Sequence, residues 1–442
     1  MGNAGGGLEI GGTIGDYENA LFLFALKSLE QQIGEENLIY VLVSYLPVPG
    51  HIEEMKTKPT QQAIRHLSGH GIFPDFIFCR AVQPLDEIRK KKIETYANIA
   101  RQYIISAPDV ETIYSIPLNF EKENTGRKIL DKFGLKPRRT PEWSQWSLLT
   151  QRILEAPTEL KIAMVGKYVG SGSFPSADSY LSVNHALHHA AAALNARVSI
   201  DWIDAKHFEA DPSRAPECLS GYHGILVPGA FGQAGAEGMV HAVRYAREND
   251  VPYLGLCFGL QIAVVEFARN VCGMKGANST EIDPSTPYPV IDILPSQRQV
   301  IEESRYGGTM RLGDYAASLK EGSLVFELYR QRGRLEKDQA QWEAIRATQS
   351  FRLGVADDHA STVFERHRHR CEVSPGYVEK LEQGGLVFPG YHRREDGTVL
   401  MEFIELPGHP YFVACQGHPE FKSRLEEPAP LFYGFIEAAL KK

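Results

Sequence analysis

The segment of this chain best suited to covalent chemistry is PYLGLCFGLQ at residues 252–261, in which Cys257 has a glycine two residues before it and another two residues after it. The apolar start and the helix-compatible sequence that follows predict a strand, a sharp turn and a helix, with Cys257 at the turn. Such a turn exposes the side chain and aims the next amide N–H and the helix N-terminus at it, which favours the attacking thiolate. The alternative, that Cys257 is one more small buried apolar residue, is weakened by the two glycines.

A second reactive segment lies near the C-terminus, where the apolar run from Tyr411 to Cys415 precedes His418-Pro419-Glu420. A histidine can take the thiol proton, and a carboxylate two residues later can bind the other ring nitrogen and fix the tautomer. On its own, His418 would more often be a loop histidine. Because a cysteine turn stands at the end of another predicted strand, the two segments together predict a catalytic triad of Cys257, His418 and Glu420.

These motifs resemble the class I glutamine amidotransferases, whose Cys-His-Glu triad hydrolyses glutamine to glutamate and ammonia. The resemblance narrows to the CTP synthase family, because that family has segments similar to IAMVGKY (162–168), ANSTE (277–281), GGTMRLG (307–313), ERHRHR (365–370), EIGGTIGDYEN (9–19) and KTKPTQ (56–61). The last two lie outside any amidotransferase domain. The resemblance covers nearly the whole chain. It implies that the ammonia is used for ATP-dependent amination of UTP to CTP, with Mg²⁺, in a homo-oligomer that is a tetramer in this family.

The resemblance also implies a glutamine site. Its binding residues would be Gly229, Phe231, Gln261, Glu281 and Arg370, and the backbone N–H groups of residue 230 and Phe258 would form the oxyanion hole. Ala230 is a departure, because the family has a second glycine there. If that position requires a positive φ, alanine costs about 1 kcal/mol or more and could turn the N–H away from the oxyanion. Losing one such donor costs about a hundred-fold in rate.

Residues of the N-terminal third match the family's nucleotide site. The resemblance implies nucleotide contacts from Asp16, Glu18, Lys56, Lys58, Gln61 and Lys92, and a magnesium ligand at Glu9. Lysines on a loop can hold a triphosphate as point charges, and one carboxylate together with substrate phosphates is a common magnesium arrangement. From spacing alone, the alternative of solvated surface lysines would be preferred.

Two expected features of the family are absent from the sequence. No match to the phosphate-binding pattern GxxxxGK[ST] occurs in it. Because the family's phosphate loop and a metal-binding aspartate lie upstream of the segment that resembles Glu9, we expect the chain to lack the N-terminal P-loop part of its synthetase domain. The ATP site would then be incomplete and only the glutaminase half complete. Residues 233–235, Gln-Ala-Gly, replace an arginine of the family, which places GTP as an effector in doubt.

Composition excludes several other classes of protein. With 442 residues, 43% hydrophobic, 23% charged and a net charge of −8, the chain is typical of a soluble cytoplasmic protein of two or three domains. Arg366, His367, Arg368 and His369 could suggest a nucleic-acid surface, but alternation on a strand would turn half of them inward. The six cysteines have neither metal-site nor disulfide-scaffold spacing, and no apolar run is long enough for a membrane span.

Alternating strand and helix patterns predict an α/β fold with two parallel-sheet domains. We expect a partial synthetase domain at 1–133, a linker at 134–160 and a class I glutamine amidotransferase domain at 161–442. Strands are expected at 8–10, 38–49, 75–81 and 224–229, and helices at 17–32, 143–154 and 180–194. The charged segment from 331 to about 360 is longer than the family's connection, and its composition predicts a solvated surface helix.

Two rival functions remain open from sequence. One is an amidotransferase that supplies ammonia to a separate synthetase chain, which co-purification of a P-loop partner would favour. The other is a catalytically weak regulatory or assembly protein that binds CTP synthase or nucleotide. Ala230 favours the second rival mildly, whereas the retention of Cys257, His418 and Glu420 opposes it.

Overall fold

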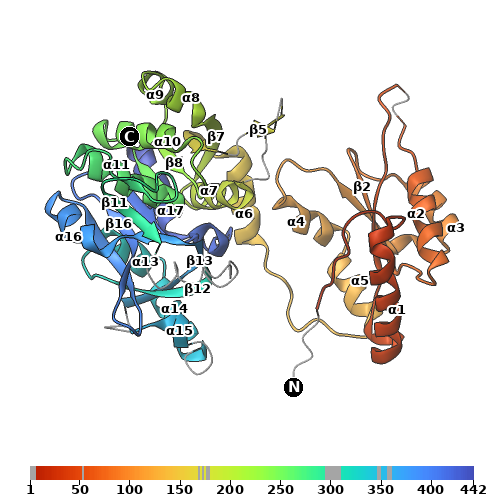
Figure 1. Ribbon diagram of the computed structural model, residues 1–442. Helices are drawn as coiled ribbons and strands as arrows, with labels where there is room; N and C mark the ends of the chain where they lie inside the picture. The colour runs from red at the N-terminus through yellow and green to blue at the C-terminus, as the bar shows by residue number, and fades with distance from the viewer. Residues whose placement is uncertain are drawn as a thin grey trace. The chain divides into compact units, whose positions relative to one another are not determined.

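The computed structural model describes residues 6–51, 54–167, 170–171, 174–175, 180–293, 310–345, 350–355 and 361–442. The chain divides into two compact units, the first ending at Thr150 and the second beginning at Gln151 (Figure 1). The α/β prediction is confirmed in both. No helix among the described residues is long and apolar enough to cross a membrane.

The first unit is built on a three-stranded parallel sheet in the order β1-β2-β3. The strands are β1 (Val41–Tyr45), β2 (Phe76–Ala81) and β3 (Ile104–Pro108). The helices are α1 (Ala20–Ile33), α2 (Lys58–Gly69), α3 (Glu87–Ala97), α4 (Ser115–Lys122) and α5 (Thr125–Lys132), with 3-10 turns at Tyr17–Asn19, Glu35–Asn37 and Arg101–Tyr103. Each strand leads into a helix, which is the connection that parallel strands require.

The two faces of the first sheet are covered unequally. Helices α2 and α3 pack side by side, and Ile64 and Ile93 from them join Leu42 and Ile77 in the core (Figure 1). On the other face β1 is open, and Val43 is 65% exposed. Parallel sheets are usually buried on both faces, so this apolar surface is unusual for the fold.

The second unit contains a nine-stranded mixed sheet in the order β13-β12-β15-β16-β17-β9-β8-β4-β7. Its strands are β4 (Thr158–Gly166), β7 (Ala196–Asp204), β8 (Gly224–Val227), β9 (Tyr253–Leu256), β12 (Arg311–Leu319), β13 (Thr362–His369), β15 (Val387–Arg393), β16 (Val399–Glu405) and β17 (Phe412–Cys415). The five strands from β17 to β7 are parallel, as predicted, and the other four join them antiparallel. Small additional sheets are formed by β10 (Asn278–Ser279), β11 (Pro289–Ile293) and β14 (Cys371–Val373), and by β5 (Gly170–Ser171) and β6 (Phe174–Pro175).

Helices cover both faces of this larger sheet, and each face has its own apolar core. One core includes residues of α8 (Lys206–Ala210), α9 (Arg214–Leu219), α10 (Ala236–Glu248), α11 (Phe258–Asn270) and α16 (Pro375–Gln383). The other includes α7 (Leu181–Ala193), α13 (Leu324–Gln331) and α17 (Pro430–Lys441). Alternate residues of β4, such as Ala163 and Met164, point into the two cores, so the parallel strands are held from both sides.

Two local predictions were wrong. Residues 8–10 form neither helix nor strand: Leu8 and Glu9 are exposed, Ile10 packs against the small core of Leu23, Leu67 and Ile72, and β1 pairs with β2 instead. The charged segment after Gln331 contains helices, α14 (Arg334–Ile345) and α15 (Ser350–Leu353), but it is not a solvated excursion. Trp342 of α14 packs in a small core with Leu353, Ala316 and Phe364, and Arg334 and Asp338 are buried as an ion pair. Residues 346–349 and 356–360 of this segment lie outside the described residues.

The predicted linker at 134–160 contains regular structure. Helix α6 (Ser144–Glu155) matches the helix expected at 143–154, and β4 already begins at Thr158. The second unit begins at Gln151, within the predicted linker.

Candidate active site

Cys257 occupies a strained turn between β9 and α11. Its backbone angles are φ 51° and ψ −99°, a region that residues with a side chain rarely adopt, and the cysteine is the N-cap of the helix. Its N–H donates to the carbonyl oxygen of Cys415 on the neighbouring strand at 2.7 Å. The predicted strand, turn and helix are present, and strain of this kind at a helix N-terminus is typical of a nucleophile.

The flanking glycines allow this turn to pack closely. A Cβ atom on Gly259 would lie 2.2 Å from the carbonyl oxygen of Val227, and one on Gly255 would lie 2.8 Å from the Cβ of Ala414. Both positions therefore exclude any side chain. Glycine stands on each side of Cys257 because β8 and β17, the two neighbours of β9 in the sheet, leave no room for a side chain there.

His418 and Glu420 lie beside Cys257 at the end of β17. The Nδ1 atom of His418 is 2.7 Å from Oε1 of Glu420, and the glutamate is buried. A Cβ on Gly229, at the end of β8, would lie 2.9 Å from Cε1 of His418 and 3.5 Å from Cβ of Cys257. The histidine and the cysteine thus flank the same glycine, and the three predicted triad residues meet at one point.

The charge state of His418 follows from these neighbours. Burial by itself lowers the pKa of His418, but the charge of Glu420 and the charge and hydrogen bonding of Cys257 raise it well above the usual 6.5. The protonated imidazolium is therefore favoured beside the sulfur of Cys257. A pair of this kind holds the nucleophile ready and keeps a proton available for a leaving group.

The predicted oxyanion loop lies at the same edge of the sheet. Ala230 is buried in the core and does not have a positive φ; in this loop it is Gly232 that does, at 79°. The strain considered for alanine at this position therefore does not arise. Phe258 is the first residue of α11, where N–H groups have no acceptor within the helix, so its N–H is available to an oxyanion.

Three of the predicted glutamine-binding residues, Gln261, Glu281 and Arg370, lie around Cys371, whereas Gly229 lies beside His418 and Phe231 is exposed. Gln261 donates through Nε2 to the carbonyl oxygen of Cys371 at 3.0 Å, and Oε2 of Glu281 lies 3.7 Å from its sulfur. Arg370, half-buried, is the adjacent residue in the chain. Oxygen Oε1 of Glu281 also accepts from the N–H of Gly232 at 2.7 Å, which links these side chains to the oxyanion loop.

Sequence reasoning missed two polar residues at this site. Gln416 is fully buried, and its Nε2 donates to Sγ of Cys257 at 3.7 Å while its Oε1 accepts from Gln261 at 3.2 Å. Lys167 follows β4 and donates to the carbonyl oxygen of Gly232. Both had the same signal as the residues that were found, since each directly follows a buried strand of the parallel sheet.

Residues 366–369 alternate between exposed and buried positions along β13. His367 and His369 of β13 are buried, whereas Arg366 and Arg368 are exposed, as alternation on a strand predicts. His367 bonds Glu402 at 2.7 Å. The histidines therefore belong to a buried polar network rather than to a basic surface.

The predicted nucleotide-binding residues of the first unit are more dispersed than the residues around Cys257. Lys56 forms an ion pair with Glu54 at 2.6 Å, and Glu54 also contacts Arg89 at 3.2 Å. Lys92 contributes to a lowered pKa of Glu54, for which the hydrogen bond from Lys56 is the largest cause. These lysines therefore surround one carboxylate beyond the carboxyl ends of β1 and β2, where ligands bind in parallel sheets.

The remaining predicted nucleotide residues lie near helix starts. Lys58 and Gln61 are in the first turn of α2, and Gln61 donates to Oγ1 of Thr57 at 3.4 Å. Glu18 is in the exposed turn before α1. Asp16 accepts from the N–H and hydroxyl of Thr13 at 2.7 and 2.6 Å, and these bonds lower its pKa.

Comparison with known proteins identifies the family. A sequence profile described as CTP synthase N-terminus matches residues 7–135, and one described as Glutamine amidotransferase class-I matches residues 176–438. Proteins named CTP synthase from Thermococcus gammatolerans and Pyrococcus abyssi are 45% and 44% identical to this chain over 98% of its length, with 74% and 72% of their own lengths covered. The chain belongs to the CTP synthase family.

A solved structure agrees with this family in the second unit. The Trypanosoma brucei CTPS glutaminase domain with bound acivicin is 32% identical, and the match covers 64% of this chain and 94% of that one with a TM-score of 0.53. As a member of the CTP synthase family, the chain is a glutamine-dependent ligase of pyrimidine biosynthesis, in which glutamine hydrolysis serves the amination of UTP.

The expected loss of the P-loop part of the synthetase domain is not supported. The CTP synthase N-terminus profile matches residues 7–135, so that domain is present in this chain. The prediction rested on one missing motif and on the position of the family's phosphate loop upstream of the segment that resembles Glu9. The view that only the glutaminase half is complete falls with it.

Membership of the CTP synthase family implies that the reaction uses ATP and Mg²⁺. Among the described residues, no group of three or more His, Cys, Asp and Glu side chains is placed to hold a metal ion. Glu9 is an exposed carboxylate, and both oxygens of Asp16 accept from Thr13. Glu9 alone fits one role, a single carboxylate ligand to Mg²⁺ that is otherwise held by nucleotide phosphates.

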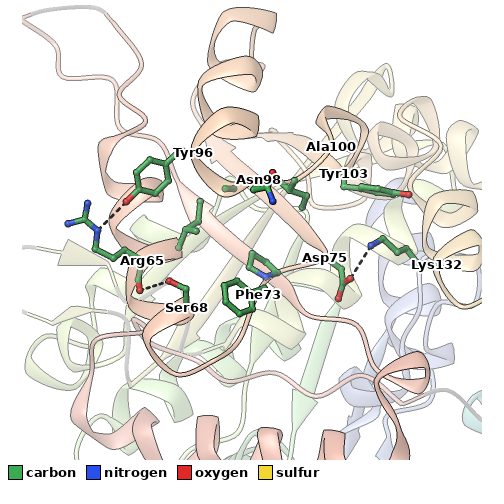
Figure 2. Close-up of a pocket in the computed structure, with 13 residues that line it drawn as sticks. Arg65, Ser68, Phe73, Asp75, Tyr96, Asn98, Ala100, Tyr103 and Lys132 are labelled. Carbon is green, nitrogen blue, oxygen red and sulfur yellow. Dashed lines mark hydrogen bonds and ion pairs between the residues drawn. The ribbon is translucent and has the colours of Figure 1, made fainter.

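A cavity of about 600 Å³ in the first unit lies elsewhere (Figure 2). It is lined by residues that precede β2 and β3, at the amino ends of the strands, and none of the predicted nucleotide residues lines it. Its charged groups have partners, since Lys132 bonds Asp75 at 3.1 Å and Arg65 bonds the hydroxyl of Tyr96 at 3.2 Å. Lys132 is thus paired with a carboxylate, whereas the hydroxyl that Arg65 contacts is neutral.

Proposed function

We propose that Cys257, His418 and Glu420 are the residues that hydrolyse glutamine in this member of the CTP synthase family. The observation that carries this proposal is the strained turn that presents Cys257 beside a histidine whose other ring nitrogen bonds a buried glutamate at 2.7 Å. A thiolate needs a base to create it and a fixed imidazole to return the proton. These three side chains supply both functions.

The reaction begins with attack of the Cys257 sulfur on the carboxamide carbon of glutamine. The N–H groups of Ala230 and Phe258 stabilise the oxyanion of the tetrahedral intermediate. His418 gives its proton to the leaving nitrogen, so that ammonia departs and a thioester to Cys257 remains. His418 then removes a proton from water, the hydroxide displaces the sulfur, and glutamate is released.

Glutamine recognition would come from groups around the loop at 229–232. We assign Gly229 and Phe231 to the wall of the site, and Gln261, Glu281 and Arg370 to the amino-acid end of the substrate. A carboxylate and a guanidinium suit the ammonium and carboxylate of an α-amino acid. Contacts of Gln261 and Glu281 with Cys371, next to Arg370, support this assignment.

We assign UTP to the first unit, at Asp16, Glu18, Lys56, Lys58, Gln61 and Lys92, with CTP as the product released from the same segment. The position of Lys56 and Lys92 around Glu54, at the carboxyl side of the sheet, supports this assignment. Bound Mg²⁺ would neutralise phosphate charge on the nucleotides, and Glu9 would contribute one oxygen ligand. ATP would be bound by the same unit.

We further propose a domain division into a synthetase domain at 1–133, a connecting segment at 134–160 and an amidotransferase domain at 161–442. The resemblance to the family supports a cytoplasmic homo-oligomer, in which the exposed apolar residues of β1 are available for contacts between copies.

GTP is expected to have a weak effect on glutamine hydrolysis, because residues 233–235 lack an arginine.

Labelling with acivicin, the ligand of the related Trypanosoma brucei domain, tests the catalytic assignment. We expect one covalent adduct by mass spectrometry, on the peptide that contains Cys257, and protection by excess glutamine. The buried Cys371 and Cys415 serve as internal controls, since both are near the site. An adduct on another cysteine, or labelling that glutamine does not slow, would contradict the proposal. The alternative function, a catalytically weak regulatory or assembly protein, loses the feature that favoured it, because Ala230 does not have a positive φ.

A further inference from the structure

Lys167 lies at the carboxyl edge of the parallel sheet, directly after β4, as Gly229, Cys257 and His418 follow neighbouring strands. The triad mechanism does not use it. Its ammonium lies over the ring of Phe258, 4.1 Å from the centroid, and donates to the carbonyl oxygens of Gly232 and, at 3.5 Å, Phe231. A lysine with these contacts touches the oxyanion loop and the first residue of the catalytic helix together.

The carbonyl of Phe231 and the N–H of Gly232 belong to one peptide unit, and the two ends of this unit meet opposite charges. Lys167 donates to the carbonyl at 3.5 Å, and Glu281 accepts from the N–H at 2.7 Å. If this peptide rotated by half a turn, the N–H would face the ammonium and the carbonyl would face the carboxylate. Both contacts would become repulsive, so the charges select one orientation.

A third charged contact holds the far end of the loop. Glu209 accepts from the N–H of Gly235 at 3.0 Å. Gly232 and Gly235 have positive φ, at 79° and 77°, and glycine is free to change its backbone angles. The loop that carries the Ala230 N–H therefore contains two residues with wide backbone freedom, and side-chain contacts restrict it.

We infer that Lys167 is a positioning residue for glutamine hydrolysis, which together with Glu281 locks the 231–232 peptide unit and thereby fixes the direction of the Ala230 N–H toward the oxyanion. This inference rests on the proposed function of Cys257. It concerns the loop only, since Lys167 takes no proton and touches no reacting atom.

The ammonium form that the lock requires is present at neutral pH. Burial lowers the pKa of Lys167 to about 8, and the charges of Glu281 and Glu209 act in the opposite direction. The lysine thus remains mostly protonated near pH 7. A neutral residue of the same length would keep the packing against Phe258 and lose both the charge and the donors.

The test compares Lys167→Met with Lys206→Met. Lys206 is an exposed lysine at the start of α8 that also approaches Gly235, and neither oxygen of the 231–232 segment accepts from it among the bonds of the described residues. For each full-length variant, the glutamine KM, the kcat of glutamate release and the rate of Cys257 alkylation by iodoacetamide are measured. Alkylation needs the thiolate but no oxyanion hole. Its rate therefore reports on the turn that presents Cys257 and not on the loop at 229–232.

We expect Lys167→Met to lower kcat about ten- to a hundred-fold, with KM and alkylation rate within about twofold of the wild type. Lys206→Met should match the wild type in all three. A kcat within about twofold of the wild type, or a loss of alkylation in proportion to kcat, would overturn the inference. Should Lys167→Met fail to fold, Lys167→Gln is measured in the same way. Absence of Cys257-dependent hydrolysis in the wild type would instead refute the proposed function.

Discussion

The two units place their proposed functional side chains in opposite environments. In the second unit, Cys257, Glu420 and Gln261 are buried and each has a partner at hydrogen-bond distance. In the first unit, Lys58 and Lys92 are exposed. A site that makes and breaks a covalent bond needs fixed geometry and excludes water, whereas a site that receives a triphosphate needs charges that remain accessible.

The two sheets differ in the same way. The parallel strands of the second unit have an apolar core on each face, and their carboxyl ends hold the catalytic groups. In the first unit, Val43 is 65% exposed and Phe24 of α1 is 61% exposed. We therefore expect substitutions around Cys257 in the second unit to change the rate of glutamine hydrolysis. Substitutions of the exposed lysines in the first unit should change the affinity for UTP.

The largest effect is expected for His418→Ala. Without the imidazole, neither the thiol proton nor the ammonia proton is transferred, so kcat for glutamine hydrolysis should fall about a thousand-fold or more. Steady-state glutamate release measures it. His66→Ala, which removes an exposed histidine of the first unit, should leave the rate unchanged. Comparable losses in both variants would show that the contrast between the units is false.

Glu420→Gln should change the pH dependence as well as the rate. The charge of Glu420 raises the pKa of His418 against the lowering effect of burial, so its removal lowers that pKa. We expect kcat to fall about ten- to a hundred-fold, and the alkaline limb of the pH–rate profile to move to lower pH.

The same shift has a consequence for stability. Because the folded-state pKa of His418 lies above its usual 6.5, the pair stabilises the wild type fully below that pH and progressively less as pH rises through the folded value. Thermal unfolding between pH 6 and pH 10 should therefore show a smaller alkaline loss in Glu420→Gln than in the wild type. An unchanged alkaline limb and an unchanged stability profile would contradict the account.

Two helical glycines give a matched comparison of packing. Gly259 and Gly126 are both the second residue of a helix, α11 and α5. A Cβ on Gly259 would meet a carbonyl oxygen at 2.2 Å, whereas one on Gly126 would meet nothing within 4 Å. We expect Gly259→Ala to destabilise the second unit by about 1–3 kcal/mol and Gly126→Ala to stabilise the first by ~0.5–1 kcal/mol, in denaturant unfolding. Equal changes in the free energy of unfolding for the two variants would mean that the turn at Cys257 is not closely packed.

The smallest effect is expected for single lysines of the first unit. Lys56→Ala and Lys92→Ala should each raise the Kd for UTP about three- to tenfold, because one point charge near the phosphates is lost. Isothermal titration calorimetry measures this. Lys122→Ala, at the end of α4, is the control. Glutamine hydrolysis should be unaffected in all three, and a fall in that rate would show that these lysines serve the second site.

Local motifs pointed to the proposed catalytic residues from sequence alone. The elbow at Cys257 needs glycines on both sides, and His418 and Glu420 are two residues apart, so the signal lies within short segments. Gln416 and Lys167 were missed because their roles depend on partners from other strands. The backbone angle of Ala230 was equally beyond sequence reasoning, because it depends on how the loop after β8 folds.

The segment after Gln331 shows why composition alone failed there. Its many charges predicted exposure, but Arg334 pairs with Asp338 at 3.0 Å and with Glu365 at 3.4 Å, and Asp338 accepts from the N–H of Phe364 at 2.8 Å. Buried charges of this kind are indistinguishable from surface charges in a sequence, because their partners lie on β13. The helix therefore supports the strand whose Arg366 carbonyl oxygen accepts from the N–H of His418 at 2.7 Å.

Glutamate release from glutamine by the purified chain tests whether Cys257 is the nucleophile. The wild type is compared with Cys257→Ala and with Cys218→Ala, which removes an exposed cysteine of the same unit. The account predicts that Cys257→Ala abolishes the release and that Cys218→Ala matches the wild type. Release by the wild type no faster than by Cys257→Ala would contradict the assignment of the triad.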